Sequence, residues 1–375
     1  MRNSLFVMTI LLFVCHQLKA QTSTTVFYSG EEGYHSYRIP AIIKTQDGDL
    51  LAFAEGRKNR RGDVGDIDLV YKRSTNNGQS WSKMKVIVDN NDGVAGNPSP
   101  VVIDKNGKIV LLFVIQAVNT HQKAIRQGIP PKGGRTPYII ISEDHGKQWS
   151  KPRSLEKSCD KKIWGWYATG PGHGIEIKKG KYKGRIVIPA NHNLITTTQK
   201  DPINPGFSAH LIYSDDQGDT WKIGAIDEES SKSRYMNPNE TMLTELANGD
   251  LYINSRNCLG ATVCKRADAW SCDGGEHFTT KSFTPNLYLQ TPNCQGSIIS
   301  YGDTIIFSGP YELNRKDLTL WASYDKGHHW TKKKCIHKGN AAYSDLVKIS
   351  STELGVLYES KDIKFKKILL SEIDL

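Results

Sequence analysis

Beyond residue 20 the sequence has no apolar run long enough to cross a bilayer, and it lacks extended helical periodicity. The first absence argues against a protein with membrane-spanning helices, and the second argues against an all-helical fold. The cysteines do not have the spacing of a zinc site, so we expect no metal and no cofactor. The formal net charge is +10, but the basic residues are scattered, which argues against a nucleic-acid partner. An anionic small substrate is the other reason for such a charge.

The first 20 residues have the pattern of a secretory signal peptide. A basic residue at position 2 precedes the apolar run LFVMTILLFVC, and HQLKA then ends on the small residue Ala20. Because this run is too short to span a bilayer, we expect cleavage near Ala20 and an exported protein, periplasmic or secreted to the cell surface. The mature chain is then residues 21–375, which we expect to be monomeric. Export permits disulfides, and pairing among Cys258, Cys264 and Cys272 is one option.

One eight-residue phrase occurs five times in the chain. It reads Ser, any residue, Asp or Asn, any residue, Gly, two further residues and an aromatic, and it begins at Ser74 (STNNGQSW), Ser142 (SEDHGKQW), Ser214 (SDDQGDTW), Ser271 (SCDGGEHF) and Ser323 (SYDKGHHW). The Asp or Asn side chain can accept backbone N–H bonds inside a tight turn, and Gly adopts the conformation that other residues resist. We therefore expect five structural turns, with the aromatic packed between neighbouring sheets, and no catalytic role for their acidic residues.

Short apolar runs such as GKIVLLFVI, GRIVIPA and GDLYINS lie between these phrases. Their content of Val, Ile, Leu and Tyr, and the Gly, Asp and Asn at their ends, predict β-strands. Short strands that repeat at a period of roughly 60 residues indicate a propeller with four strands per blade. The sequence therefore predicts an all-β fold, a six-bladed β-propeller.

The five phrases are the Asp-box (BNR) signature, and the chain resembles the bacterial exo-α-sialidases, or neuraminidases. The resemblance implies the sialidase propeller over residues 21–375. It also implies retaining hydrolysis of terminal α-linked sialic acid from glycoproteins, glycolipids and oligosaccharides. A trans-sialidase, acting between or within molecules, and a non-catalytic propeller that binds sialylated glycans are the alternatives. Since Asp boxes also occur in non-catalytic proteins, the activity depends on residues outside them.

The resemblance assigns three arginines to a clamp on the substrate carboxylate. They are Arg38 in YRIP, Arg266 in KRADAWSCDGG and Arg315 in NRKDLTLW. A planar guanidinium holds a carboxylate through two parallel charge-assisted bonds, which a lysine cannot do. Arg256 in NSRN is the alternative to Arg266.

Three more residues are assigned to binding or support. Arg57, which ends GDLLAFAEGR, resembles the family arginine that contacts the sugar near O4. Asn97 in AGNPSPVVI stands where many relatives have Asp, near O4 and the N-acetyl group. Glu359 in LYES is expected to pair with Arg38 and hold it in place.

The catalytic groups follow from the same resemblance. Asp63 has the family's spacing after Arg57 and is predicted to be the acid/base, with Asp66 and Asp68 as alternatives. Tyr343 in AAYSDL is predicted to be the nucleophile. A neutral phenol can approach an anomeric carbon that bears its own carboxylate without like-charge repulsion, and sialidases are known exceptions to the two-carboxylate scheme.

A tyrosine nucleophile needs a base, because its ordinary pKa is near 10. Glu245 in NETMLTELANGDL is predicted to take this proton. Glu240 is the alternative, and we expect it to precede the strand that carries Glu245.

Overall fold

The computed structural model describes residues 23–118, 120–126, 134–195, 206–230, 236–258, 266–311 and 313–375. The predicted signal peptide, residues 1–20, lies outside these described residues, and so does Cys264. Among the described residues, no helix combines the length and the apolar character needed to cross a membrane.

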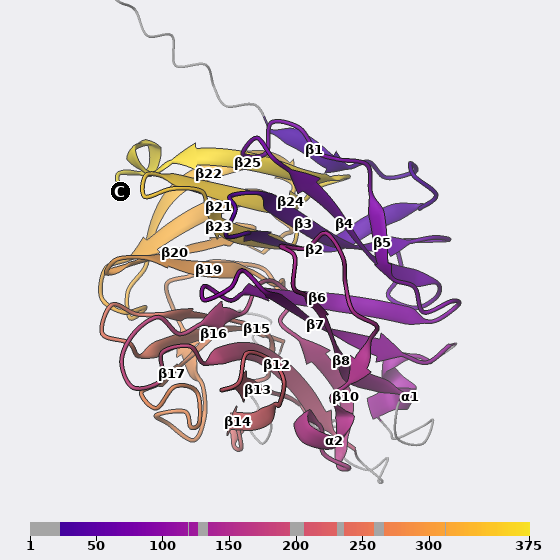
Figure 1. The fold of residues 1–375 in the computed structure, drawn as a ribbon. Helices are drawn as coiled ribbons and strands as arrows, with labels where there is room; N and C mark the ends of the chain where they lie inside the picture. The colour runs from indigo at the N-terminus through magenta and orange to yellow at the C-terminus, as the bar shows by residue number, and fades with distance from the viewer. Residues whose placement is uncertain are drawn as a thin grey trace, which may run out of the picture.

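The regular secondary structure of the described chain is almost entirely β-strand, arranged as sheets around a common centre (Figure 1). Hydrogen bonding groups the described strands into five sheets. One of them joins the first and last described strands and consists of β1 (Thr24–Phe27), β25 (Ile363–Leu369), β24 (Glu353–Glu359) and β23 (Ser344–Lys348). Because β1 pairs with β25, the first strand closes the last sheet, and Figure 1 shows the two together.

Three further sheets follow the order of the chain. The five-stranded sheet contains β10 (Trp164–Thr169), β11 (Ile175–Glu176), β12 (Ile186–Leu194), β13 (Phe207–Ser214) and β14 (Lys222–Ile226). The next contains β15 (Pro238–Glu245), β16 (Leu251–Asn257), β17 (Arg266–Ser271) and β18 (Thr284–Asn286). The third contains β19 (Ser297–Tyr301), β20 (Thr304–Gly309), β21 (Lys316–Ser323) and β22 (Thr331–Asn340).

The remaining sheet has eight strands. They are β2 (Ser36–Lys44), β3 (Leu50–Arg57), β4 (Ile67–Ser74), β5 (Lys85–Val88), β6 (Val94–Val102), β7 (Ile109–Gln116), β8 (Arg135–Ser142) and β9 (Arg153–Ser154). Its two halves are antiparallel meanders, and they meet where Ile67 of β4 pairs in parallel with Val94 of β6. The helical elements are short, namely α1 (Gln122–Arg126), α2 (Glu156–Cys159) and the 3₁₀ turn η2 (Leu370–Ile373).

The prediction of an all-β propeller is confirmed. Six separate blades are not seen at the level of hydrogen-bonded sheets, because four sheets have the size of one blade and the fifth has eight strands. The strands nearest the centre nevertheless form a closed ring, in which β2, β6, β10, β15, β19 and β23 contact one another in turn and β23 contacts β2.

The five repeated phrases form the turns that the sequence predicts. At Ser214 the hydroxyl donates to Asp216 Oδ1 (2.8 Å) and accepts the N–H of Gly218 (2.9 Å). Asp216 Oδ1 also accepts the N–H of Thr220 (2.8 Å). The phrases at Ser74, Ser142, Ser271 and Ser323 repeat this pattern. Each turn follows the third strand of a four-stranded meander. The Asp or Asn side chain of each phrase accepts a backbone N–H of its own turn.

The glycine and the aromatic of each phrase lie where one meander packs against its neighbour. Gly78 has a φ of 82°, in the left-handed region, and a Cβ there would lie 2.1 Å from the ring of Phe365 on β25. Trp81 packs edge-on against the same Phe365, with ring centroids 5.5 Å apart. Only a glycine permits this close approach, so the phrase stabilises the ring on which the central cavity depends.

Candidate active site

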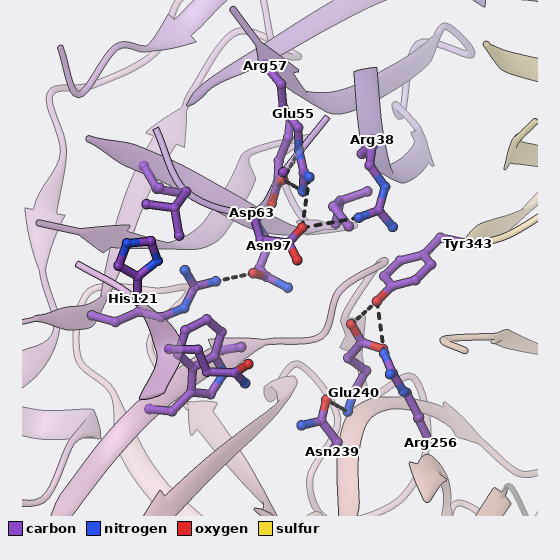
Figure 2. Close-up of a pocket in the computed structure, with 18 of the residues that line it drawn as sticks. Arg38, Glu55, Arg57, Asp63, Asn97, His121, Asn239, Glu240, Arg256 and Tyr343 are labelled. Carbon is purple, nitrogen blue, oxygen red and sulfur yellow. Dashed lines mark hydrogen bonds and ion pairs between the residues drawn. The ribbon is translucent and has the colours of Figure 1, made fainter. Parts of the chain in front are cut away.

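A cavity of about 720 Å³ lies where the innermost strands meet (Figure 2). Its lining contains most of the residues that the sequence singles out, but not all of them. Those that line it are Arg38, Arg57, Asp63, Asn97, Arg315 and Tyr343, together with the two alternatives Glu240 and Arg256.

Several innermost strands are irregular at the point where they reach this cavity. Register shifts occur between Arg38 and Ala41 on β2, Gly96 and Ser99 on β6, Trp164 and Tyr167 on β10, and Pro238 and Thr241 on β15. A bulge bends the strand and re-aims its side chains. The residues within or at the edge of these shifts that line the cavity are Arg38, Ile39, Asn97, Trp166, Asn239 and Glu240.

Tyr343 lies directly before β23 and forms a tight group with Glu240 and Arg256 (Figure 2). Its phenol donates a short hydrogen bond to Glu240 Oε1. Arg256 Nη1 donates to Glu240 Oε2 at 2.8 Å and to Tyr343 Oη at 3.1 Å. Burial, followed by the charge of Glu240, raises the pKa of Tyr343 well above its ordinary value. In the free protein Tyr343 is therefore a neutral phenol with a carboxylate ready to accept its proton.

The prediction that Glu245 contacts Tyr343 is wrong. Glu245 is the last residue of β15, and its two oxygens accept the N–H groups of Lys178 (2.8 Å) and Lys179 (2.9 Å). The sequence predicts that Glu240 precedes this strand, but β15 begins at Pro238 and includes it. Five strand residues correspond to about 16 Å, so the two glutamates cannot serve the same site.

The assignment of Arg266 to the clamp is also wrong. Arg266 is fully buried, and its guanidinium donates to Asn254 Oδ1 and to the carbonyl of Cys294 (2.8 Å). It does not line the cavity, whereas Arg256 does. Arg266 therefore ties β17 to its neighbours, and Arg256 takes the place beside Tyr343.

Three guanidiniums surround the ring of Tyr343. The Cζ atoms of Arg38 and Arg315 lie 5.1 and 5.5 Å from the ring centroid, and Arg256 bonds the phenol oxygen. Asn293 links two of these arginines, since its side-chain oxygen accepts from Arg256 and its carbonyl accepts from Arg315 Nη2 (3.1 Å). Like charges gathered in this way favour an anionic ligand.

The predicted pairing of Glu359 with Arg38 is confirmed. Glu359 Oε2 lies 3.3 Å from Arg38 Nε, and Oε1 accepts the N–H of Ile39 at 2.7 Å. The glutamate is 1% exposed. Because Ile39 has a φ of 58°, which is unusual for a branched residue, this bond also stabilises the strained backbone beside the clamp.

Asp63 lies on the loop between β3 and β4, and 73% of its side chain is exposed. Its Oδ1 accepts from Arg57 Nη1 at 2.8 Å and from Arg38 Nη1 at 3.2 Å. Partial burial acts to raise the pKa of Asp63, but the positive charges of Arg57 and then Arg38 lower it, and the pKa lies below its ordinary value. The alternatives Asp66 and Asp68 both pair with Lys58 and do not line the cavity. Asp63 is thus the member of this acidic group that can reach a ligand.

Comparison with known proteins supplies the family. Residues 48–356 match the family model described as a BNR repeat-like domain. The chain is 31% identical to the exo-alpha-sialidase of Aspergillus fumigatus over 88% of this chain and 79% of that protein, and 30% identical to the exo-alpha-sialidase of Arthroderma benhamiae over the same shares. The solved structure of the Hadza microbial sialidase Hz136 matches with a TM-score of 0.80 at 25% identity, over 94% of this chain and 69% of that one. The chain belongs to the sialidase family.

Two further residues of this sialidase line the cavity, although the sequence analysis gave them no role. Arg135, at the start of β8, donates to Asn97 Oδ1, and its Cζ lies 4.1 Å from the ring centroid of Trp166. Burial lowers the pKa of Arg135 to about 10. Asn97 itself has a φ of 56°. The side of the cavity beyond Asp63 is therefore rich in hydrogen-bond donors and has one aromatic face.

One sequence signal could have located the irregular strands. Pro40 and Pro98 lie inside the runs that become β2 and β6, and a proline inside a strand is confined to edges and bulges. Each lies within two residues of a cavity residue, Arg38 or Asn97. In the described part of this sialidase there is no group of three His, Cys, Asp or Glu side chains placed to hold a metal ion.

Proposed function

We propose that the protein is an exo-α-sialidase that removes terminal α-linked sialic acid from glycoproteins, glycolipids and oligosaccharides. The observation that carries this proposal is the phenol of Tyr343, hydrogen-bonded to Glu240 and surrounded by the guanidiniums of Arg38, Arg256 and Arg315. The relatives named exo-alpha-sialidase support the same activity.

The three arginines bind the carboxylate on the anomeric carbon. This carboxylate then lies over Tyr343 and brings the anomeric carbon close to the phenol oxygen. Charge-assisted bonds to Arg are strong and direct the anion into a single orientation. Arg57, Asn97 and Arg135 supply the donors on the other side of the sugar ring.

In the first chemical step Tyr343 Oη forms a bond to the anomeric carbon as the glycosidic C–O bond breaks. The phenolic proton passes to Glu240, and Asp63 donates its proton to the departing oxygen. In the second step Asp63 takes a proton from water, and the oxygen of that water bonds to the anomeric carbon as the bond from Tyr343 Oη to this carbon breaks. Glu240 returns its proton to Tyr343 Oη, which restores the free enzyme. Two displacements retain the α configuration.

Activity is tested with a fluorogenic sialoside and the full chain. We expect hydrolysis by the wild type and its loss in Tyr343→Phe, because a phenyl ring has no oxygen to attack with. Tyr301→Phe is the matched control, since Tyr301 donates to the carbonyl of Glu353 away from the cavity. Free sialic acid as the sole stable product supports hydrolysis. A transferred or anhydro product would make the protein a trans-sialidase, and binding without turnover would make it a lectin.

We also propose that the eight-stranded sheet acts as two blades, which gives a six-bladed propeller. Its halves share the single parallel pair Ile67–Val94, and each half has the antiparallel order of the other sheets. The closed ring of innermost strands supports this count. A crystal structure with continuous pairing between β4 and β6 would contradict it.

Export is proposed from residues 1–20. Cell fractionation should recover the protein outside the cytoplasm, with a mature chain that begins at Gln21. Recovery of the uncleaved chain from the cytoplasm would contradict export.

A further inference from the structure

Glu55 is a buried carboxylate of β3 that lies behind the cavity, and it is 3% exposed. Its Oε2 accepts from Arg57 Nε (3.1 Å) and Arg57 Nη2 (2.5 Å), and its Oε1 accepts the N–H of Asn97 (2.9 Å). Gly96 leaves room for this contact, because a Cβ there would lie 2.5 Å from Glu55 Oε1. One carboxylate therefore holds both Arg57 and the strained backbone of Asn97.

Arg57 is shared between two carboxylates of different exposure. Glu55 holds its Nε and Nη2 edge, and Asp63 accepts from Nη1 (Figure 2). The side chains of Arg57 and Glu55 are 3% and 4% exposed, whereas that of Asp63 is 73% exposed. A charge pair away from water interacts more strongly than an exposed one. Glu55 therefore offsets much of the charge that Arg57 would otherwise direct at Asp63.

Arg38 repeats this arrangement on the other side of Asp63. Its Nε contacts the buried Glu359, and its Nη1 contacts Asp63. Both arginines that touch Asp63 thus have a buried glutamate against another edge. Glu55 pairs with Arg57 in the same way as Glu359 pairs with Arg38.

We propose that Glu55 is a positioning residue of the sialidase reaction, which fixes Arg57 and offsets part of its charge, so that Asp63 is held less strongly in its ionised form than the two arginines alone would hold it. The proposal rests on the function proposed above. A general acid must carry its proton at the working pH, and two uncompensated guanidiniums would keep Asp63 ionised.

The other charged groups near Asp63 are the background against which Glu55 acts. Asp63 faces Arg38, Arg57 and Arg135 from β2, β3 and β8. Its own loop carries further cations, and α1 and the residue before it line the same cavity. These groups are Arg60, Arg61, His121 and Lys123. Of all these groups only Arg57 changes in the variants described next, so shifts between variants report Glu55 and Arg57.

The test is the dependence of kcat/KM on pH for a sialyl-lactose substrate, measured with the full chain. The alkaline limb reports loss of the proton from the acid. In Glu55→Gln we expect this limb to move to lower pH by about one unit, because Arg57 then acts more fully on Asp63. A nitrophenyl sialoside, which needs little protonation, should show a smaller fall in kcat/KM. Glu176→Gln is the control, a buried acid of β11 that bonds Asp104 N and Lys178 away from the cavity.

Arg57→Gln and the double variant complete the cycle. Arg57→Gln should move the alkaline limb to higher pH, and adding Glu55→Gln should move it back toward the wild type. The double variant leaves neither buried charge unpaired, so it remains foldable if Glu55→Gln alone is not. The pH of the alkaline limb in the double variant, compared with that in Arg57→Gln, then still tests the role of Glu55.

Two outcomes are separable. If the wild type does not turn over any sialoside, the proposed function fails. If the wild type is active, but Glu55→Gln lowers kcat/KM equally at every pH and for both substrates, Glu55 has only a structural role and this inference is overturned. The same conclusion follows if the limb does not move between Arg57→Gln and the double variant.

Discussion

Arg256 and Arg266 lie directly opposite one another across β16 and β17, yet Arg256 lines the cavity and Arg266 does not. Arg256 bonds Glu240 and Tyr343, whereas Arg266 bonds Asn254 and the carbonyl of Cys294. Two facing strand positions therefore hold one arginine that lines the cavity and one that is buried in contact with Asn254 and the Cys294 carbonyl.

Replacing each of these arginines with lysine should have different effects. Arg256→Lys keeps the charge but loses the planar grip, and we expect a cost on the order of 2–4 kcal/mol in kcat/KM with little change in Tm. Arg266→Lys should lower Tm because its buried bonds are lost, and it should leave KM near the wild-type value. Steady-state kinetics and thermal unfolding check both. The assignment reverses if Arg266→Lys is the variant that raises KM.

The two glutamates of β15 can be separated by trapping the covalent intermediate. A 3-fluoro-sialosyl fluoride should label the peptide that contains Tyr343, as measured by mass spectrometry. Glu240→Gln should slow labelling by about 10²-fold or more, because Gln cannot accept the phenolic proton. Glu245→Gln should label at the wild-type rate. Slow labelling in Glu245→Gln alone would restore Glu245 as the base.

Asp63→Asn should have an effect that depends on the leaving group. Sialyl-lactose has a poor leaving group and should lose about 10²–10⁴-fold in kcat/KM. A nitrophenyl sialoside departs without much protonation and should lose far less. Equal losses for both substrates would show that Asp63 does not act as the acid.

The stability of the fold should fall in acid through a buried histidine pair. His192 and His210 contact each other through their Nδ1 atoms at 3.0 Å, and Trp164 stacks on His192 with ring centroids 3.7 Å apart. Burial lowers the pKa of His210 to about 3 and that of His192 well below its ordinary value. The unfolded chain therefore binds protons that the folded chain does not.

The stability from this pair is complete above about pH 6.5 and decreases as the pH falls toward 3. In His210→Gln the free energy of unfolding should depend less on pH in this window, by up to about 1.4 kcal/mol per pH unit. Urea unfolding at pH 4 to 7 measures the slope. His277→Gln, at an exposed position, is the control. An unchanged slope in His210→Gln would contradict the linkage.

The repeated turns could be predicted from sequence because all their polar contacts lie within eight residues. The choice between Glu240 and Glu245 depends on where β15 begins. The ends of a strand are harder to predict from sequence than its existence. The bulge before Thr241 extends the strand back to Pro238 and turns Glu240 toward the centre. The alternation of apolar and polar residues along the sequence does not reveal this bulge.

The resemblance assigns Arg266 to the clamp in the segment KRADAWSCDGG, which leads into the fourth repeated phrase. Spacing along one strand does not reveal whether a side chain ends in the cavity or under the sheet. Here the answer depends on Asn254, a strand neighbour that accepts from Arg266. Glu55 was missed although Arg57 follows it by two residues, a spacing that places both side chains on one face of β3.

The pairing of β1 with β25 has a consequence for the time at which the enzyme appears during synthesis. Arg38 and its partner Glu359 are 321 positions apart. A ribosome that has released only the first half of the chain has made Arg38 and Asp63 but neither Tyr343 nor the strand that covers β1. Domains commonly begin to fold while the chain is still emerging, but this cavity cannot be completed before Tyr343, Glu359 and β25 have been synthesised. A growing chain that lacks β25 is therefore expected to be inactive.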